Sequence, residues 1–288
     1  MPYAVASLAD LPVSLQPAAG QSFNSTDRPV SFCVFPGRTY LKEWGRWENT
    51  PEQALLFTEA GILSIQAPAS PGQSARMISM RAADLLYARI SLILMYGRME
   101  LVGKDLTWVV VEFNAAGFDL IQDGLQNFLG VSAGNNLNSF PQAAPPKTLL
   151  DALGGLSYKF RNGLVLYGLL PGEQILGFVF QPALWGRRWH LLPLKISETT
   201  LLVLTDKQLI IVEEQSRSRF PAYGWTFTFY PRPIIENVGV KSASPWPEVI
   251  IELKRGAGLH DRSLLLEEPN SLAWQALWSC FGNLLPVP

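Results

Sequence analysis

The residue types that most often carry catalysis are sparse in this chain of 288 residues. It contains two cysteines, Cys33 and Cys280, and two histidines, His190 and His260. The cysteines are too far apart in the sequence for a CxxC motif, a zinc site or a disulfide framework, so we expect two buried or half-buried thiols in a reducing compartment. With two histidines, a metal site would have to draw heavily on carboxylates. We therefore predict no metal and no cofactor.

Two segments resemble catalytic motifs but lack the context that such motifs need. Gly130–Gly134, GVSAG, satisfies the G-x-S-x-G pattern, in which a serine sits on a strained turn from a strand into a helix. Here Ser132 follows an expected helix and precedes a polar linker, so nothing would hold it on such a turn. Asp206 and His260 follow it in the chain order of a catalytic triad, but any later Asp and His would do the same. Gly97–Lys104 has five residues between its glycines, where a phosphate loop has four. We predict no catalytic residue, and an enzyme of unknown type is the weakest of three hypotheses.

The segment most suggestive of ligand binding is Trp185–Lys195, WGRRWHLLPLK. Its guanidinium groups and aromatic rings could hold an anionic head group at a membrane interface, because arginine binds phosphate and carboxylate oxygens through charge-assisted hydrogen bonds. The candidate ligand-binding residues are Arg187, Arg188, Trp189 and Lys195.

A related segment in the first half of the chain favours a structural interpretation of the same feature. Glu43–Asn49, EWGRWEN, repeats the Trp-Gly-Arg-Trp order but adds two glutamates. Arginine stacked on tryptophan in both halves would serve packing rather than ligand contact. The sequence leaves both interpretations open.

Composition narrows the class of protein. Apolar residues make up 48% of the chain and charged residues 16%, with nine Trp, eight Tyr and fifteen Phe, which is typical of a globular β-rich protein. A formal net charge of −1 provides no overall attraction for nucleic acid, so no nucleic-acid partner is expected. The N-terminus lacks the basic flank of a signal peptide, and the apolar runs fall short of the ~20 residues of a membrane span. We expect a cytoplasmic protein.

Hydrophobic periodicity divides the chain into two β-rich halves. Short strands are expected from Phe32 to Val111, followed by an amphipathic helix from Phe118 to Leu129 with Gly130 at its C-terminal cap. Strands resume after a proline-bearing linker and a glycine-containing helix, and a last helix carries Leu272, Trp274, Leu277, Trp278 and Phe281. The expected organisation is an arm at 1–28, a first domain at 29–130, a linker at 131–147, and a helix plus second domain at 148–288.

The two halves also follow the same order, which predicts an internal repeat. Ala54–Ala67 and Leu201–Glu214 each contain an apolar run that ends in a threonine, then a polar step and a second apolar run. Thr58 in the first half corresponds to Thr205 in the second. The distance from this threonine to the first apolar residue of the following helix is 118 − 58 = 60 in one half and 272 − 205 = 67 in the other.

Seven strands followed by one helix resemble the pleckstrin-homology (PH) superfold, and the second half is similar to bacterial PH-like domains. The similarity rests on PGEQIL (171–176), LLVLTDKQLIIV (201–212) and TFYPRPIIENVGV (228–240), and it is weaker in the first half. It implies a barrel or bent sheet closed by the final helix, in which Trp274 and Trp278 pack as core residues. In PH domains that bind phosphoinositides, the lipid site is the loop between the first two strands, where Trp185–Lys195 lies.

We therefore predict a mainly β protein with C-terminal capping helices, built as two tandem PH-like seven-stranded barrels or bent sheets. The expected function is non-enzymatic: binding or scaffolding through a protein or peptide partner, at an exposed edge strand or beside the C-terminal helix. The alternative is peripheral binding of anionic lipid through Trp185–Lys195, with the protein then peripheral to the membrane. The sequence leaves open whether the chain forms a homo-oligomer.

Overall fold

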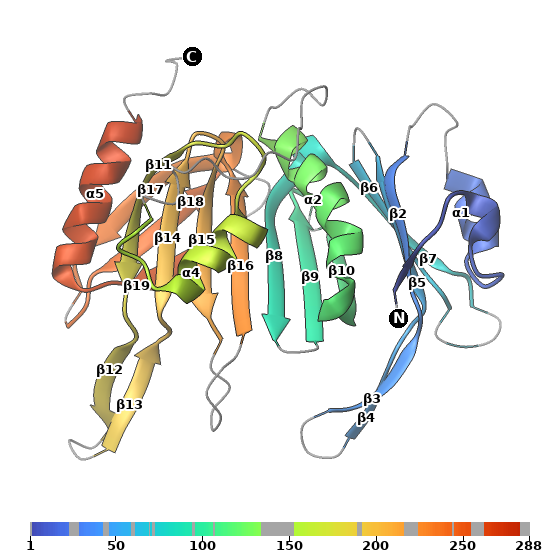
Figure 1. The fold of residues 1–288 in the computed structure, drawn as a ribbon, viewed down its shortest axis with the longest axis horizontal. Coiled ribbons are helices and arrows are strands. Elements are labelled where there is room, and N and C mark those ends of the chain that lie inside the picture. Colours follow the sequence, from blue (N-terminus) through green and yellow to red (C-terminus); the bar gives the residue numbers. More distant parts are fainter. Residues whose placement is uncertain are drawn as a thin grey trace. The chain divides into compact units, whose positions relative to one another are not determined.

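A computed structural model gives the fold (Figure 1). It describes residues 2–22, 29–42, 46–58, 61–68, 70, 73–93, 96–105, 107–133, 153–188, 192–215, 224–243, 245–254 and 262–282. The chain divides into two compact units, Met1–Ser139 (unit 1) and Phe140–Pro288 (unit 2). The secondary structure is mainly antiparallel β-sheet, with a helix at the C-terminal end of each unit.

Unit 1 begins with an N-terminal segment that precedes two antiparallel sheets. The segment comprises β1 (Tyr3–Ala4), η1 (Leu8–Asp10) and α1 (Gln16–Ser22). The first sheet has the order β1-β2-β5-β6-β7, with β2 (Pro29–Phe35), β5 (Gln53–Thr58), β6 (Gly61–Gln66) and β7 (Arg76–Arg81). A 3-10 turn, η3 (Ala82–Asp84), leads into the antiparallel strands β8 (Leu85–Ile93), β9 (Tyr96–Gly103) and β10 (Trp108–Asn114). After η4 (Ala115–Gly117), the helix α2 (Asp119–Ser132) ends the described part of the unit.

Helices cover both faces of the first sheet of unit 1. On one face α2 packs on β2, β5 and η3, and the buried Cys33 thiol donates a hydrogen bond to the Leu120 carbonyl oxygen at 2.9 Å. Burial raises the pKa of this thiol. On the other face Leu11 and Leu15 of the N-terminal segment pack in a cluster with Phe32 and Leu56. The strands β5 and β6 therefore bury both of their faces, which explains why few polar residues interrupt them.

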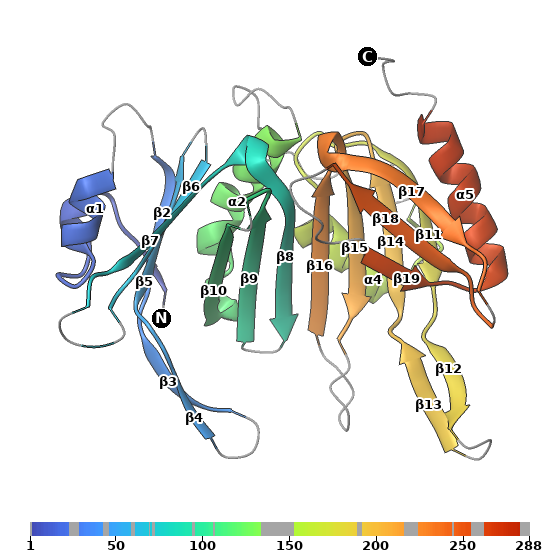
Figure 2. The same ribbon diagram turned by 180° about the vertical axis from the view of Figure 1, so that it is seen from behind.

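Unit 2 has a comparable order of elements. The helices α4 (Tyr158–Gly163) and η5 (Leu164–Gly168) precede an antiparallel sheet of β11 (Ile175–Gln181), β14 (Thr200–Thr205), β15 (Gln208–Glu214) and β16 (Gly224–Pro231). A 3-10 turn, η6 (Arg232–Ile234), again leads into three strands, β17 (Ile235–Lys241), β18 (Glu248–Leu253) and β19 (Arg262–Leu265), which are drawn in orange and red in Figure 2. The helix α5 (Glu268–Gly282) follows them.

Each unit also carries a two-stranded hairpin between its first long strand and the next. In unit 1 the hairpin is β3 (Arg38–Lys42) with β4 (Arg46–Thr50), and in unit 2 it is β12 (Leu184–Arg188) with β13 (Leu192–Ser197). Both hairpins project beyond the sheets of their own units (Figures 1 and 2). The apolar run from Ile175 to Trp185 is divided between β11 and β12 at Pro182, because proline cannot donate a ladder hydrogen bond.

Three sequence expectations need correction. The described strands form open sheets and do not close into barrels. The helix α2 continues to Ser132, so Gly130 is a buried helical residue and not a cap. Leu272 is 59% exposed, whereas Trp274 on the same helix is fully buried. Residues two apart on a helix lie about 200° apart around its axis, so these two side chains cannot share the core face.

Candidate functional site

The structure locates the predicted ligand-binding residues on the hairpin β12–β13. Arg187 and Arg188 end β12, where the structure describes their backbone, and Trp189 lies outside the described residues. Lys195 pairs across the hairpin with Trp185, and its ammonium group forms an ion pair with the Glu198 carboxylate. That ion pair opposes the anion-binding role that we predicted for Lys195.

The same hairpin exposes several apolar side chains. Trp185 is 59% exposed, Leu194 45% and Ile196 37%. The Ile196 side chain packs over Gly186, since a Cβ atom at Gly186 would lie 3.1 Å from Ile196 Cδ1. Exposed apolar groups on a projecting hairpin are typical of an interaction surface. The Trp-Gly-Arg-Trp match between the two halves, in contrast, is not a structural equivalence: Trp185 and Gly186 lie on the outgoing strand β12, whereas Arg46 and Trp47 lie on the returning strand β4.

The structure gives Ser132 no catalytic surroundings. It is the last residue of α2, its side chain is buried, and its hydroxyl group donates a hydrogen bond to the Phe128 carbonyl oxygen at 2.8 Å. A nucleophile elbow requires a strand-to-helix turn that exposes the hydroxyl group. His260 lies outside the described residues, and within the described chain no group of three or more His, Cys, Asp or Glu is placed to hold a metal.

A pocket of about 380 Å³ opens at one end of unit 1. It lies where the β5–β6 turn, the end of β7 with η3, and the β9–β10 turn come together. Apolar side chains and charged groups of both signs share its lining, which consists of Leu56, Thr58, Gly61, Ile62, Leu63, Ser79, Met80, Arg81, Asp84, Gly103, Lys104, Asp105 and Thr107. The charged groups are held in place: Arg81 pairs with Asp84 at 2.6 Å, and Lys104 donates to the Ala83 carbonyl oxygen at 2.8 Å. The volume suits a small ligand or one side chain of a partner.

The pocket lies at the end of an open strand edge. Within the sheet formed by the described residues of unit 1, β7 is the last strand and pairs with β6 alone. Arg76, Met77 and Ser79 on β7 are exposed, while Met80 is buried. An edge strand presents backbone donors and acceptors to any extended segment that approaches it.

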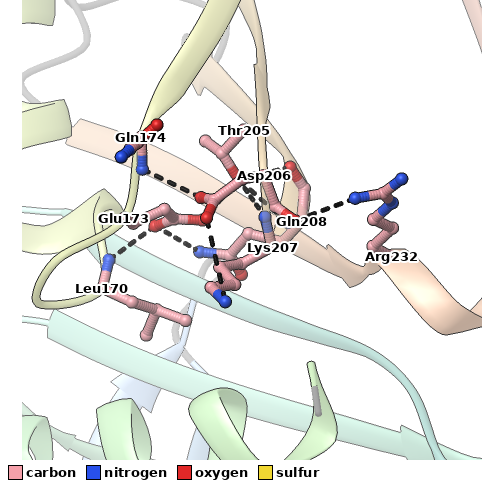
Figure 3. A network of polar contacts seen from close by, with 8 residues as sticks. All are labelled: Leu170, Glu173, Gln174, Thr205, Asp206, Lys207, Gln208 and Arg232. Carbon is pink, nitrogen blue, oxygen red and sulfur yellow. Dashed lines mark hydrogen bonds and ion pairs between the residues drawn. The ribbon is translucent and has the colours of Figure 1, made fainter. Parts of the chain in front are cut away.

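Unit 2 contains a buried acid beside its β14–β15 turn. Glu173 lies in the turn between η5 and β11 (Figure 3) and is only 8% exposed. One of its oxygens, Oε2, accepts hydrogen bonds from the Leu170 backbone N–H at 2.6 Å and from Gln208 Nε2 at 3.1 Å. The other, Oε1, lies 2.5 Å from the Thr205 hydroxyl oxygen. Burial raises the pKa of Glu173 to about 7, against the lowering effect of these hydrogen bonds.

We predicted no role for Glu173 from the sequence, although it lies in PGEQIL (171–176), one of the segments that resemble PH-like domains. A glutamate that follows proline and glycine is predicted to lie in a solvent-exposed turn. Only the fold places the Thr205 hydroxyl group and the Gln208 amide, more than thirty residues later in the chain, against it (Figure 3).

Among the described residues, no helix has the length and apolar character needed to cross a membrane. A scan of protein-family models finds no match to this chain, and a search of curated proteins finds none either. Three features of the structure therefore remain as candidate functional sites: the hairpin β12–β13, the β7 edge with its pocket, and the Glu173 network.

Proposed function

We propose that this chain is a non-enzymatic binding or scaffolding protein of two tandem PH-like domains, and that unit 1 recognises an extended segment of a protein or peptide partner. The observation that carries this proposal is the open edge of β7 ending at the pocket. The common element order of the two units, four long strands, a 3-10 turn, three strands and a helix, supports the tandem PH-like architecture.

Recognition by strand addition needs two features, and unit 1 offers both. Backbone groups on a free strand edge supply hydrogen bonds, and pockets beside the edge select side chains of the added segment. In unit 1 the edge is β7, and the pocket reaches its last residues, Ser79, Met80 and Arg81. Buried Leu56 and Met80 make part of the lining apolar, and the charged groups lie with them in the same pocket. We expect a partner segment with an apolar or amphipathic side chain at the position that enters the pocket.

The test is selection of linear peptides from a phage-displayed random library on the full chain, followed by affinity measurement on two variants. Ser79→Trp fills the pocket and should weaken binding of the selected peptides by about tenfold or more. Met77→Trp is the matched control, because Met77 lies two residues earlier on the same face of β7 and outside the pocket lining. Equal affinity for both variants, or no peptide selected, would contradict the proposal.

The exposed hairpin β12–β13 favours a second candidate function, peripheral binding to anionic lipid. Trp185, Leu194 and Ile196 could enter the interface while Arg187 and Arg188 approach the head groups. Co-sedimentation with neutral and anionic vesicles, at low and moderate salt, tests it. Salt-sensitive binding to anionic vesicles that is lost in an Arg187→Ala/Arg188→Ala variant would support it. Absence of binding by the folded wild type would exclude it.

A further inference from the structure

The Glu173 carboxyl group is enclosed by donors and has no cationic partner within the described part of the chain. Asp206 is the charged group that acts on it, and repulsion from Asp206 adds to the effect of burial. The nearby cations are directed at Asp206 itself: Lys207 Nζ lies 3.8 Å from its carboxylate, and Arg232 Nη1 donates to its backbone oxygen at 3.4 Å (Figure 3). The carboxyl group is therefore stabilised by hydrogen bonds alone, which can serve either protonation state.

The two oxygens of this carboxyl group differ in what they can do. Oε2 meets two N–H donors, from Leu170 and Gln208, which can only donate, so it must accept in both protonation states. Oε1 meets the Thr205 hydroxyl group, which can donate or accept. When the acid binds a proton, that proton belongs on Oε1.

Thr205 has one hydroxyl proton and two acceptors within reach. Its Oγ1 lies 2.5 Å from Glu173 Oε1 and 2.8 Å from the Gln208 carbonyl oxygen. With Glu173 ionised, the hydroxyl proton points to Oε1. With Glu173 protonated, the acid donates to Oγ1 and the hydroxyl proton turns to the Gln208 carbonyl oxygen. Because a hydroxyl oxygen accepts two hydrogen bonds, Oγ1 then keeps the Gln208 N–H donor at 2.9 Å and gives up the longer contact with the Lys207 N–H at 3.1 Å. The closed arrangement therefore satisfies the acid in both states, and titration need not unfold the unit.

We propose that Glu173 is a proton-operated latch, which holds the turn between η5 and β11 closed on the β14–β15 turn when it is protonated and lets the turn open when it is ionised. Besides the carboxyl group, the buried Leu170 side chain and two hydrogen bonds hold the closed turn: the Asp206 backbone N–H donates to the Gln174 carbonyl oxygen at 3.0 Å, and the Gln174 N–H donates to the Asp206 carboxylate at 2.9 Å. Opening hydrates the carboxylate and removes the cost of burying its charge.

The direction of the effect follows from linkage. Closed, the group has a pKa of about 7, and in water its ordinary value is 4.5. Between these values the closed turn holds a proton that the open turn releases, so opening becomes about tenfold more favourable for each unit of rising pH. Above pH 7 the opening equilibrium no longer changes with pH. The opening equilibrium of the latch therefore changes with pH in the range just below neutrality.

Nuclear magnetic resonance on the full chain tests the latch. The ¹³C signal of the Glu173 carboxyl carbon should titrate with a midpoint near pH 7. The hydrogen-exchange protection factor of the Leu170 amide, after correction for the intrinsic rate, should fall about tenfold per pH unit between pH 5 and 7. The amide of Leu55, on the central strand β5 of unit 1, should keep constant protection over the same range.

Two variants make the result specific. Glu173→Gln carries an amide that can donate to Thr205 and accept from Leu170 and Gln208, so its turn should stay protected at every pH. Thr205→Ser keeps the hydroxyl group and should keep the pH dependence. A Glu173 midpoint near its ordinary value, or equal Leu170 protection at pH 5 and 7, would overturn the proposal. If Glu173→Gln does not fold, the wild-type titration and the Leu170 protection decide it alone.

Discussion

The turns that follow Thr58 and Thr205 share a frame of hydrogen bonds between the threonine hydroxyl group and the backbone of the residue three positions later. The two turns differ in the groups that lie beside this frame. Thr58 Oγ1 accepts from the Gly61 N–H at 3.0 Å, and Thr205 Oγ1 accepts from the Gln208 N–H at 2.9 Å. Each hydroxyl oxygen also lies within hydrogen-bond distance of the carbonyl oxygen of the same residue, at 3.2 Å and 2.8 Å. In unit 1 this frame borders a pocket, and in unit 2 it encloses a carboxyl group. The same turn geometry thus lies beside a solvent-accessible pocket in unit 1 and beside a buried carboxyl group in unit 2.

The residue three positions after the threonine accounts for part of the difference. In unit 2 it is Gln208, whose amide binds Glu173. In unit 1 it is Gly61, where a Cβ atom would lie 2.4 Å from the Met80 carbonyl oxygen. Because the neighbouring strand β7 passes so close, no side chain fits at Gly61 without moving backbone. The position that carries the Gln208 side chain in unit 2 therefore has no side chain in unit 1, where Gly61 lines the pocket.

The largest expected effect concerns the pH dependence of unit 2. Glu173 has a pKa of about 7 in the folded chain and about 4.5 when unfolded. Between these values the folded state binds the proton that the unfolded state has released, so the free energy of unfolding falls as pH rises from 4.5 to 7 and is then level. The total loss is about 3 kcal/mol. Glu173→Gln should abolish it and exceed the wild type in stability at pH 8, as measured by urea unfolding.

A control for this prediction is Glu252→Gln in the same unit. Glu252 is an exposed acid on β18 that accepts a hydrogen bond from Asn237 Nδ2 at 3.1 Å. Its replacement controls for the loss of one carboxylate from the unit, so the slope for Glu173→Gln is compared with the slope for this variant. If both variants retain the wild-type slope between pH 4.5 and 7, the buried acid does not titrate as the structure implies.

The second prediction compares the two threonines directly. Thr205 is fully buried, and Thr205→Val would leave the Gln208 N–H and Glu173 Oε1 without their hydroxyl partner, since valine has the same shape but no polar atom. Thr58 is only partly buried, so water can replace its hydroxyl group in Thr58→Val. We expect Thr205→Val to destabilise its unit by about 2 kcal/mol more than Thr58→Val does. Equal costs in urea unfolding would show that the Glu173 network adds nothing to the shared frame.

Much of the strand order was predictable from the sequence, because it depends on local patterns. The runs at Ala54–Thr58 and Gly61–Gln66 lie on β5 and β6, and the runs at Leu201–Thr205 and Gln208–Glu214 lie on β14 and β15. Each run is apolar, short and bounded by turn residues, which is sufficient to identify a buried strand.

The features that escaped prediction depend on contacts between distant parts of the chain. The hairpins β3–β4 and β12–β13 pair only with themselves in the described sheets, so they lack the apolar runs of core strands. The extension of α2 past Gly130 is set by packing, since Leu129, Gly130 and Ser132 are all buried. The pocket and the Glu173 network form where turns from distant parts of the chain meet. No local sequence pattern predicts which of these turns come together.

The smallest expected effect tests how each C-terminal helix approaches its sheet. A Cβ atom at Gly124 of α2 would lie 2.5 Å from the Phe57 ring, and one at Gly177 of β11 would lie 2.5 Å from Leu277 Cδ1 of α5. Phe57 is fully buried and packed edge-on against Phe128, so it cannot move aside, whereas Leu277 is half-buried and its end can rotate.

Gly124→Ala should therefore destabilise unit 1 by about 1 kcal/mol, even though alanine favours the helix, and Gly177→Ala should change unit 2 by about half of that or less. Thermal unfolding of the two variants, followed by near-ultraviolet circular dichroism, measures the difference. A larger cost at Gly177 would mean that α5 is held on β11 as rigidly as α2 on β5. The two units would then differ at their threonine turns and not in how their helices close the sheet.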